Sequence, residues 1–135
     1  VGIFCIEMFV EKNGNVLVNE VAPRPHNSGH YTIEACVTSQ FEQHIRAITG
    51  LPLGDTSLIR PAAMRNLLGE EGYSGETLVQ GSMDTLAIPG AKLHVYGKTY
   101  TKPYRKMGHI TVTAETREEA SSLCLKAKNS VKIIS

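Results

Sequence analysis

Two glutamates can be placed opposite each other from the sequence alone. Asn13-Gly14 separates two alternating apolar runs, a pattern typical of a two-residue hairpin turn. If these residues form the turn, Lys12 pairs with Asn15, and counting back along both strands pairs Glu7 with Glu20. Like charges directly opposite in an antiparallel pair, with Cβ atoms about 5 Å apart, are destabilising. A hard cation such as magnesium, which favours carboxylates together with phosphate oxygens, fits this pair best, and a solvated strand edge is the alternative.

The same register predicts the surroundings of the two carboxylates. It places them on one mostly apolar face, with the neighbours Ile3, Cys5, Phe9, Val16 and Val18. Two acids on such a face need either a shared proton or a cation. By simple alternation Asn19 falls on the opposite face from Glu20, so a metal role for Asn19 requires a bulge in the strand.

The densest polar cluster of the chain, residues 19–30, follows this hairpin. Arg24 supplies a planar fork of donors for a carboxylate, carbonate or phosphate group. The small residues 27–29 precede a helical pattern, so their backbone N–H groups are predicted to form an anion site. His26 and His30 are candidate general acid–base groups or anion donors. The alternative is a rigid loop that carries a helix cap and a surface arginine.

A second cluster is basic. Four cations lie between Gly97 and Gly108, namely Lys98, Lys102, Arg105 and Lys106. A phosphate monoester would suit such a loop, whereas a solvated hairpin tip is the plainer interpretation.

The sequence predicts that these residues are positioned by an α+β fold of antiparallel strands and helices. In the N-terminal part we expect strands at 2–11 and 15–22 and a helical segment at 32–49 that restarts at Ser39, with an apolar stripe of Phe41, Ile45 and Ile48. A composition shift near 55–60 predicts two domains, 1–56 and 57–135. In the second we expect strands at 62–68, 92–96 and 107–113, a surface loop at 70–81, a short helix at 83–88 and a terminal helix that begins at Thr116.

Composition excludes several classes. The net charge is +1 and no basic stripe carries interleaved aromatic residues, which argues against a nucleic-acid partner. No apolar run approaches the ~18 residues of a membrane span. Three widely spaced cysteines predict reduced thiols in a cytoplasmic compartment and no zinc site. Because Val1 begins inside a predicted strand, we expect the chain to be a piece of a longer polypeptide.

Several motifs together resemble an enzyme family. They are Glu-Met-Phe-Val at 7–10, Asn-Glu-Val-Ala-Pro-Arg-Pro-His-Asn-Ser-Gly-His at 19–30, Thr-Ser-Gln-Phe-Glu-Gln-His at 38–44, His-Val-Tyr-Gly-Lys at 94–98 and Arg-Lys-Met-Gly-His at 105–109. This set resembles the ATP-grasp family of 5-(carboxyamino)imidazole ribonucleotide synthetases, also called the ATPase subunit of phosphoribosylaminoimidazole carboxylase. The resemblance implies the C-terminal half of an ATP-grasp domain followed by a small β-rich C-terminal domain.

The resemblance also implies an activity and residue roles. ATP phosphorylates bicarbonate to carboxyphosphate, whose carboxyl group passes to aminoimidazole ribonucleotide. By position, Glu7 and Glu20 look like the magnesium ligands and Asn19 like the nucleotide contact beside Glu20. The residues that look like bicarbonate and carboxyphosphate contacts are Arg24, His26 and Asn27. Lys98 and Arg105 resemble the contacts to the substrate's ribose phosphate.

Other implications concern partners and rival assignments. The family's N-terminal domain and nucleotide lid have no counterpart in this sequence, so the resemblance implies those domains as partners, a homodimer at full length, and no turnover by this chain alone. One rival is the formate-dependent glycinamide ribonucleotide transformylase, another ATP-grasp enzyme with a similar loop. A rival of a different class is a non-catalytic module that binds anions.

Overall fold

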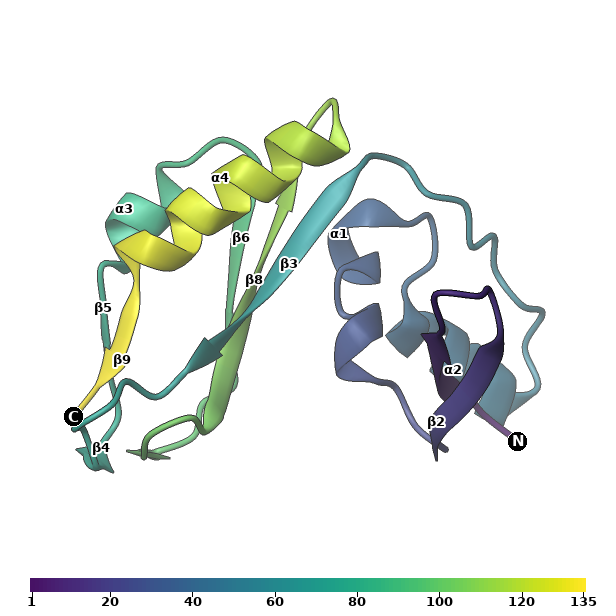
Figure 1. Ribbon diagram of the computed structural model, residues 1–135, viewed down its shortest axis with the longest axis horizontal. Coiled ribbons are helices and arrows are strands. Elements are labelled where there is room, and N and C mark those ends of the chain that lie inside the picture. Colours follow the sequence, from purple (N-terminus) through teal and green to yellow (C-terminus); the bar gives the residue numbers. More distant parts are fainter. The chain divides into compact units, whose positions relative to one another are not determined.

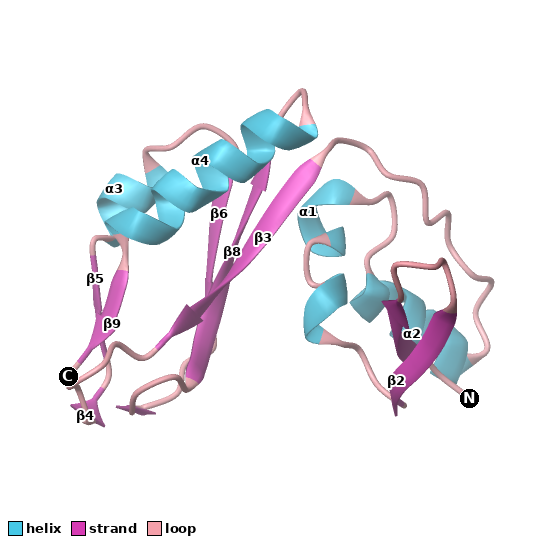
Figure 2. Cartoon of the chain, viewed as in Figure 1, coloured by secondary structure: helices cyan, strands magenta, loops and turns pink.

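The computed structural model describes all 135 residues and separates them into two compact units, Val1–Ile59 and Arg60–Ser135 (Figure 1). Both units combine antiparallel strands with helices, so the chain has an α+β fold, as expected (Figure 2). None of the helices has the length and apolar character needed to cross a membrane. Each unit is described by itself below.

The first unit is a β-hairpin followed by short helices. Its elements are β1 (Cys5–Val10), β2 (Val16–Ala22), the 3-10 turn η1 (Asn27–Gly29), α1 (Thr32–Ala35) and α2 (Gln40–Thr49). The expected restart of the helix is confirmed, because the Ser39 side chain accepts a hydrogen bond from the Glu42 N–H at 3.2 Å. The expected apolar stripe lies on the surface of this unit. Its members are 39–54% exposed, and the buried residue of α2 is Gln43.

The turn of the hairpin contains three residues, so the two-residue turn is wrong. The Glu11 N–H donates to the Asn15 carbonyl and the Gly14 N–H donates to the Glu11 carbonyl, both at 2.9 Å. Gly14 has φ 89°, which glycine adopts without steric cost. The Asn13 side chain accepts from the Asn15 N–H at 2.9 Å, and this local bond stabilises the longer loop.

The extra turn residue shifts the strand register by one position. Val10 pairs with Val16 and Met8 pairs with Val18, so these two β2 valines lie on the face away from Glu7 and are not its neighbours. The register then changes between Glu7 and Met8, and Glu7 pairs with Glu20. The bulge compensates for the longer turn, and the predicted carboxylate pair is confirmed.

The second unit is a three-stranded antiparallel sheet covered by a helix. Its main strands are β3 (Ala62–Leu68), β6 (Ala91–Val95) and β8 (Lys106–Thr113), in the order β3-β8-β6. The helix α4 (Arg117–Ser130) lies along one face of this sheet, with α3 (Ser82–Leu86) beside it (Figure 1). Thr116 begins α4 as predicted, by accepting from the Glu119 N–H at 3.1 Å.

The surface loop expected at 70–81 is wrong, because it contains two short strands. β4 (Gly75–Glu76) pairs with β7 (Tyr100–Thr101), and β5 (Leu78–Gln80) pairs with β9 (Lys132–Ile134). Their partners are remote in the sequence, so no local pattern marks them. The core of the unit comprises Leu67, Ile88, Ala91, Met107, Ile110, Val112, Cys124, Ala127, Val131 and Ile133.

Candidate functional site

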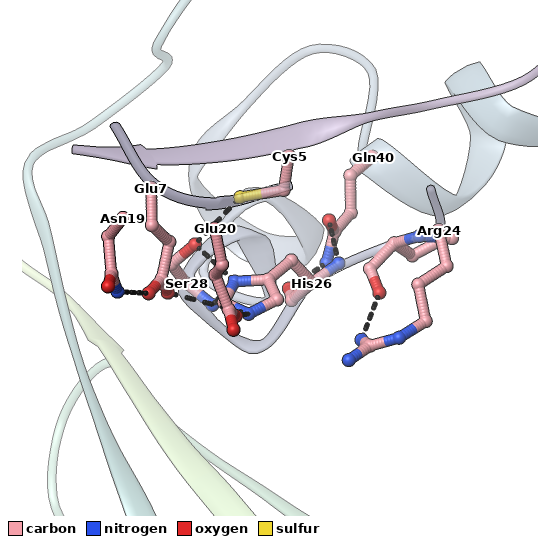
Figure 3. A network of polar contacts seen from close by, with 9 residues as sticks. Cys5, Glu7, Asn19, Glu20, Arg24, His26, Ser28 and Gln40 are labelled. Atoms are coloured by element: carbon pink, nitrogen blue, oxygen red, sulfur yellow. Dashed lines mark hydrogen bonds and ion pairs between the residues drawn. The ribbon is translucent and has the colours of Figure 1, made fainter. Parts of the chain in front are cut away.

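Two carboxylates and an imidazole converge at the base of the hairpin (Figure 3). The His26 Nε2 atom lies 3.5 Å from Glu7 Oε1 and 3.7 Å from Glu20 Oε1. One ligand atom from each of the three side chains lies within 4.8 Å of the others. Side-chain exposure is 12% for His26, 37% for Glu7 and 56% for Glu20, so the carboxylates are the part of the cluster open to solvent.

The β-bulge adds Asn19 to this cluster. Asn19 and Glu20 together oppose Glu7, and the Asn19 Nδ2 atom donates to Glu7 Oε2 at 3.3 Å. Simple alternation, which would turn Asn19 away from the carboxylates, does not hold at this bulge. The condition for Asn19 to join them, a bulge in β2, is met.

The orientation of the His26 ring is set by its own loop. Its Nδ1 atom accepts from the Ser28 N–H at 3.3 Å and lies 2.8 Å from the Ser28 hydroxyl. An acceptor at Nδ1 leaves the ring proton on Nε2, which points toward Glu7 and Glu20. The Nε2 atom therefore faces the acidic pair at 3.5 and 3.7 Å, a distance longer than a hydrogen bond.

Two of the three backbone N–H groups expected to bind an anion, those of Ser28 and Gly29, are used inside the loop. The Ser28 N–H bonds the His26 ring, and the Gly29 N–H donates to the His26 carbonyl at 3.0 Å. The following N–H, from His30, donates to the Asn27 carbonyl at 3.2 Å. These bonds hold the loop closed, so the predicted anion site is wrong for the N–H groups of Ser28 and Gly29.

The remaining loop candidates lie beside the cluster. The Arg24 guanidinium turns back to the Pro25 carbonyl at 3.1 Å and stands apart from the carboxylates, on the solvent-exposed surface (Figure 3). Asn27 begins η1. His30 stacks on Phe41, with ring centroids 5.4 Å apart, and its Nδ1 lies 2.9 Å from the Gln40 amide nitrogen.

The basic cluster of the second unit is tied to its own loop. The Lys98 ammonium donates to the Lys106 carbonyl at 2.7 Å, and the Arg105 guanidinium donates to the Tyr100 carbonyl. Gly69 supports this loop, because its N–H donates to the Arg105 carbonyl and its carbonyl accepts from the Tyr104 N–H, both at 2.9 Å. The two candidate phosphate contacts therefore belong to one ordered loop.

Two features of these sites escaped sequence reasoning. Gln40 contacts the His26 loop from α2, and only its place directly after Ser39 could have drawn attention to it. Tyr104 has φ 62°, a left-handed conformation that a residue with a side chain rarely adopts, and no sequence signal marks it.

The donor set at the hairpin fits a hard divalent cation. Glu7 and Glu20 offer carboxylate oxygens, Asn19 bonds Glu7 through its amide nitrogen, and the Nε2 atom of His26 faces both carboxylates. Magnesium binds through one or two carboxylates together with phosphate oxygens and water, while zinc favours nitrogen and sulfur. The arrangement therefore suits magnesium bound with a polyphosphate better than zinc.

Comparison with known proteins identifies similar sequences and structures. A profile of the ATP-grasp domain matches residues 1–41, and one described as the phosphoribosylaminoimidazole carboxylase C-terminal domain matches residues 62–123. The N5-carboxyaminoimidazole ribonucleotide synthase of Bacillus subtilis is 54% identical over 119 residues, which cover 88% of this chain and 30% of that protein. The chain thus spans about a third of the length of this relative.

Two crystal structures are similar over nearly the whole chain. The N5-carboxyaminoimidazole ribonucleotide synthetase from Thermotoga maritima has a TM-score of 0.96 and 64% identity, covering 100% of this chain and 38% of its own. The synthase from Aspergillus clavatus, solved in complex with ADP and 5-aminoimidazole ribonucleotide, has a TM-score of 0.83 and 41% identity, covering 95% of this chain and 34% of its own.

Proposed function

This chain belongs to the N5-carboxyaminoimidazole ribonucleotide synthetase family, and we propose that it supplies the metal-binding and anion-binding parts of an ATP-dependent carboxylating ligase. In the proposed reaction, ATP phosphorylates bicarbonate, and the carboxyl group of carboxyphosphate passes to the exocyclic amine of aminoimidazole ribonucleotide. ADP and phosphate are released. Because the chain spans only about a third of its relatives, we assign this turnover to the longer protein and expect none from the 135 residues alone.

One observation carries the proposal. Glu7 and Glu20 pair directly across the two strands, and the Asn19 amide donates a hydrogen bond to Glu7. Glu7 and Glu20 would hold magnesium, which when bound neutralises charge on the ATP phosphate oxygens. The Asn19 amide bonds Glu7 through its nitrogen, and we propose that Asn19 also contacts the nucleotide. The structure of the Aspergillus relative with ADP supports a nucleotide site in this family.

We assign the anion contacts to the loop that follows β2. Arg24 is exposed and presents a guanidinium fork, which suits bicarbonate and carboxyphosphate. The Nε2 atom of His26 faces both carboxylates, and Asn27 begins the turn directly after it, so we assign both residues to the bicarbonate and carboxyphosphate contacts. In the second unit, Lys98 and Arg105 would bind the ribose phosphate of aminoimidazole ribonucleotide, which is a ligand of the Aspergillus relative.

The rest of the proposal concerns the cellular compartment, the oligomeric state and the alternative activities. We propose a cytoplasmic, homodimeric full-length enzyme without a nucleic-acid or membrane partner, and all three cysteines are free thiols, as that compartment requires. The relatives described above are synthetases, which favours this activity over the formate-dependent transformylase. The non-catalytic anion-binding module differs from both, because it predicts no dependence on a divalent cation.

Magnesium-dependent nucleotide binding tests the proposal. We expect the chain to bind ADP more tightly with magnesium than with EDTA, measured by titration calorimetry. Glu20→Gln should weaken the magnesium-dependent binding by about tenfold or more, equivalent to ~1.4 kcal/mol. The matched control is Glu11→Gln, because Glu11 lies on the same hairpin but bonds Asn15 at the turn. Equal affinities with and without magnesium, or equal effects of the two substitutions, would count against the proposal.

A further inference from the structure

Gln40, at the start of α2, holds the His26 peptide by both of its polar groups. Its Oε1 atom accepts from the His26 N–H at 2.9 Å, and its Nε2 atom donates to the His26 carbonyl at 2.7 Å. The backbone groups define the amide orientation, because an N–H can only donate and a carbonyl can only accept. Figure 3 shows the Gln40 amide against the His26 backbone.

The remaining amide hydrogen of Gln40 is also used. Nε2 lies 2.9 Å from His30 Nδ1, so the amide makes three hydrogen bonds to one loop. Each of them would be lost with an apolar side chain of similar size, which would leave partly buried polar groups without a partner. The contact is therefore specific to an amide of this length.

The surrounding residues leave room for this amide and tie α2 to the loop. A Cβ atom at Gly29 would lie 2.5 Å from Gln40 Oε1, so any other residue there would displace the Gln40 amide. The Thr32 hydroxyl donates to the Gly29 carbonyl at 2.6 Å and accepts from the Gln40 N–H at 3.0 Å. Both ends of Gln40, backbone and side chain, are therefore bonded to the segment that carries His26.

We propose that Gln40 is a positioning residue that holds the His26 ring over the Glu7–Glu20 pair. The Gln40 amide bonds the His26 carbonyl at 2.7 Å and the His26 N–H at 2.9 Å. The Ser28 N–H then bonds Nδ1 of the ring, so that Nε2 faces both carboxylates. The importance of this placement for nucleotide binding depends on the proposed function, whereas the placement itself does not.

The same helix provides a matched control. Gln43 makes the same paired contact with Gly54, donating from Nε2 to its carbonyl at 2.7 Å and accepting its N–H at Oε1 at 2.9 Å. Gln43→Leu removes the same chemistry from the same helix, but it frees the segment at Gly54 and not the His26 loop. A loss of stability common to both variants can therefore be separated from an effect on His26.

The test is the state of the His26 ring, read by long-range ¹H–¹⁵N NMR at pH 8 without metal or nucleotide. In the wild-type chain we expect the Nε2–H tautomer to dominate. In Gln40→Leu the two ring-nitrogen shifts should move toward the averaged values of a solvent-exposed histidine, and in Gln43→Leu they should stay in place. Unchanged His26 shifts in Gln40→Leu, or equal changes in both variants, would overturn the proposal.

A gentler variant covers the case in which Gln40→Leu does not fold. Gln40→Glu keeps the length of the side chain and still accepts from the His26 N–H, but it cannot donate to the His26 carbonyl when ionised. We expect the same change in the His26 shifts, and unchanged shifts in the folded Gln40→Glu chain would overturn the proposal. Magnesium–ADP titration of the wild-type chain is read separately, so its failure would reject the proposed function without deciding the role of Gln40.

Discussion

Glu7 lies directly opposite Glu20 across β1 and β2, although the turn that joins the strands is one residue longer than the sequence pattern predicts. The longer turn alone would have paired Glu7 with Asn19. The bulge at Asn19 restores the pair by placing two residues of β2 against one of β1. It also brings Asn19 to the carboxylates, where its amide bonds Glu7.

The bulge predicts a specific role for Asn19. Asn19→Ala removes the amide that bonds Glu7 and should weaken magnesium-dependent ADP binding by about threefold to tenfold, as expected for one long, exposed hydrogen bond. Asn15→Ala is the control, because Asn15 bonds Glu11 near the turn of the same hairpin. Titration calorimetry of both variants measures the difference. An equal loss in the two would show that the effect comes from the hairpin as a whole.

The basic loop predicts that phosphate binding depends on two of its four cations. Lys98→Met and Arg105→Met should each lower the affinity of the chain for ribose 5-phosphate by about tenfold, since each removes a charge-assisted contact. Lys102→Met and Lys106→Met in the same loop should change it less than about twofold. NMR titration at low and moderate salt provides the measurement. A uniform loss across all four variants would indicate a diffuse electrostatic effect instead of a defined site.

The left-handed backbone at Tyr104 predicts that a glycine at this position raises the stability of the chain. Tyr104 has φ 62°, which costs a residue with a Cβ atom about 1–2 kcal/mol, and glycine avoids this cost at an entropic penalty of about 0.5–1 kcal/mol. Tyr104→Gly should therefore raise the free energy of unfolding by roughly 0.5 kcal/mol in urea denaturation. Tyr100→Gly, in the short strand β7, should lower it. A loss of stability in Tyr104→Gly would mean that the exposed ring contributes more than the strain costs.

The buried thiol of Cys124 predicts a pH dependence of stability. Burial in the core raises the pKa of the Cys124 thiol above its ordinary value, while Arg65 opposes the shift. The folded chain then keeps its proton at a pH where the unfolded chain loses it, so this contribution is complete below the ordinary pKa and is lost as pH rises toward the raised one. Urea unfolding at pH 7.5 and 9.5 should show a larger decrease in stability for the wild type than for Cys124→Ala.

Other groups with raised pKa values do not affect this comparison. Burial also raises the pKa of the Cys36 thiol and of the Tyr96 hydroxyl, but both residues are present in the wild type and in Cys124→Ala. The cavity left by Cys124→Ala lowers stability at both pH values, so only the difference between them carries information. Equal pH dependence in the two chains would contradict the prediction.

Much of the local structure was predictable because it depends on short-range chemistry. Ser39 and Thr116 each cap a helix through a bond to a residue three positions later, a contact decided within one turn. The strand Ala62–Leu68 and its end at Gly69 follow from an apolar run and a breaker. β4 and β5 were missed because their partners, β7 and β9, lie far along the chain.

The sequence by itself determined which residue types could form a cation and anion site, and it indicated that Glu7 and Glu20 form a pair. Only the tertiary structure decided that Asn19 joins them, that the Nε2 atom of His26 faces them, and that the N–H groups of 28 and 29 close the loop instead of binding an anion. The position of the bulge, and the contact of the Gln40 side chain with the His26 loop, depend on many competing hydrogen bonds in three dimensions. Spacing along one strand does not contain that information.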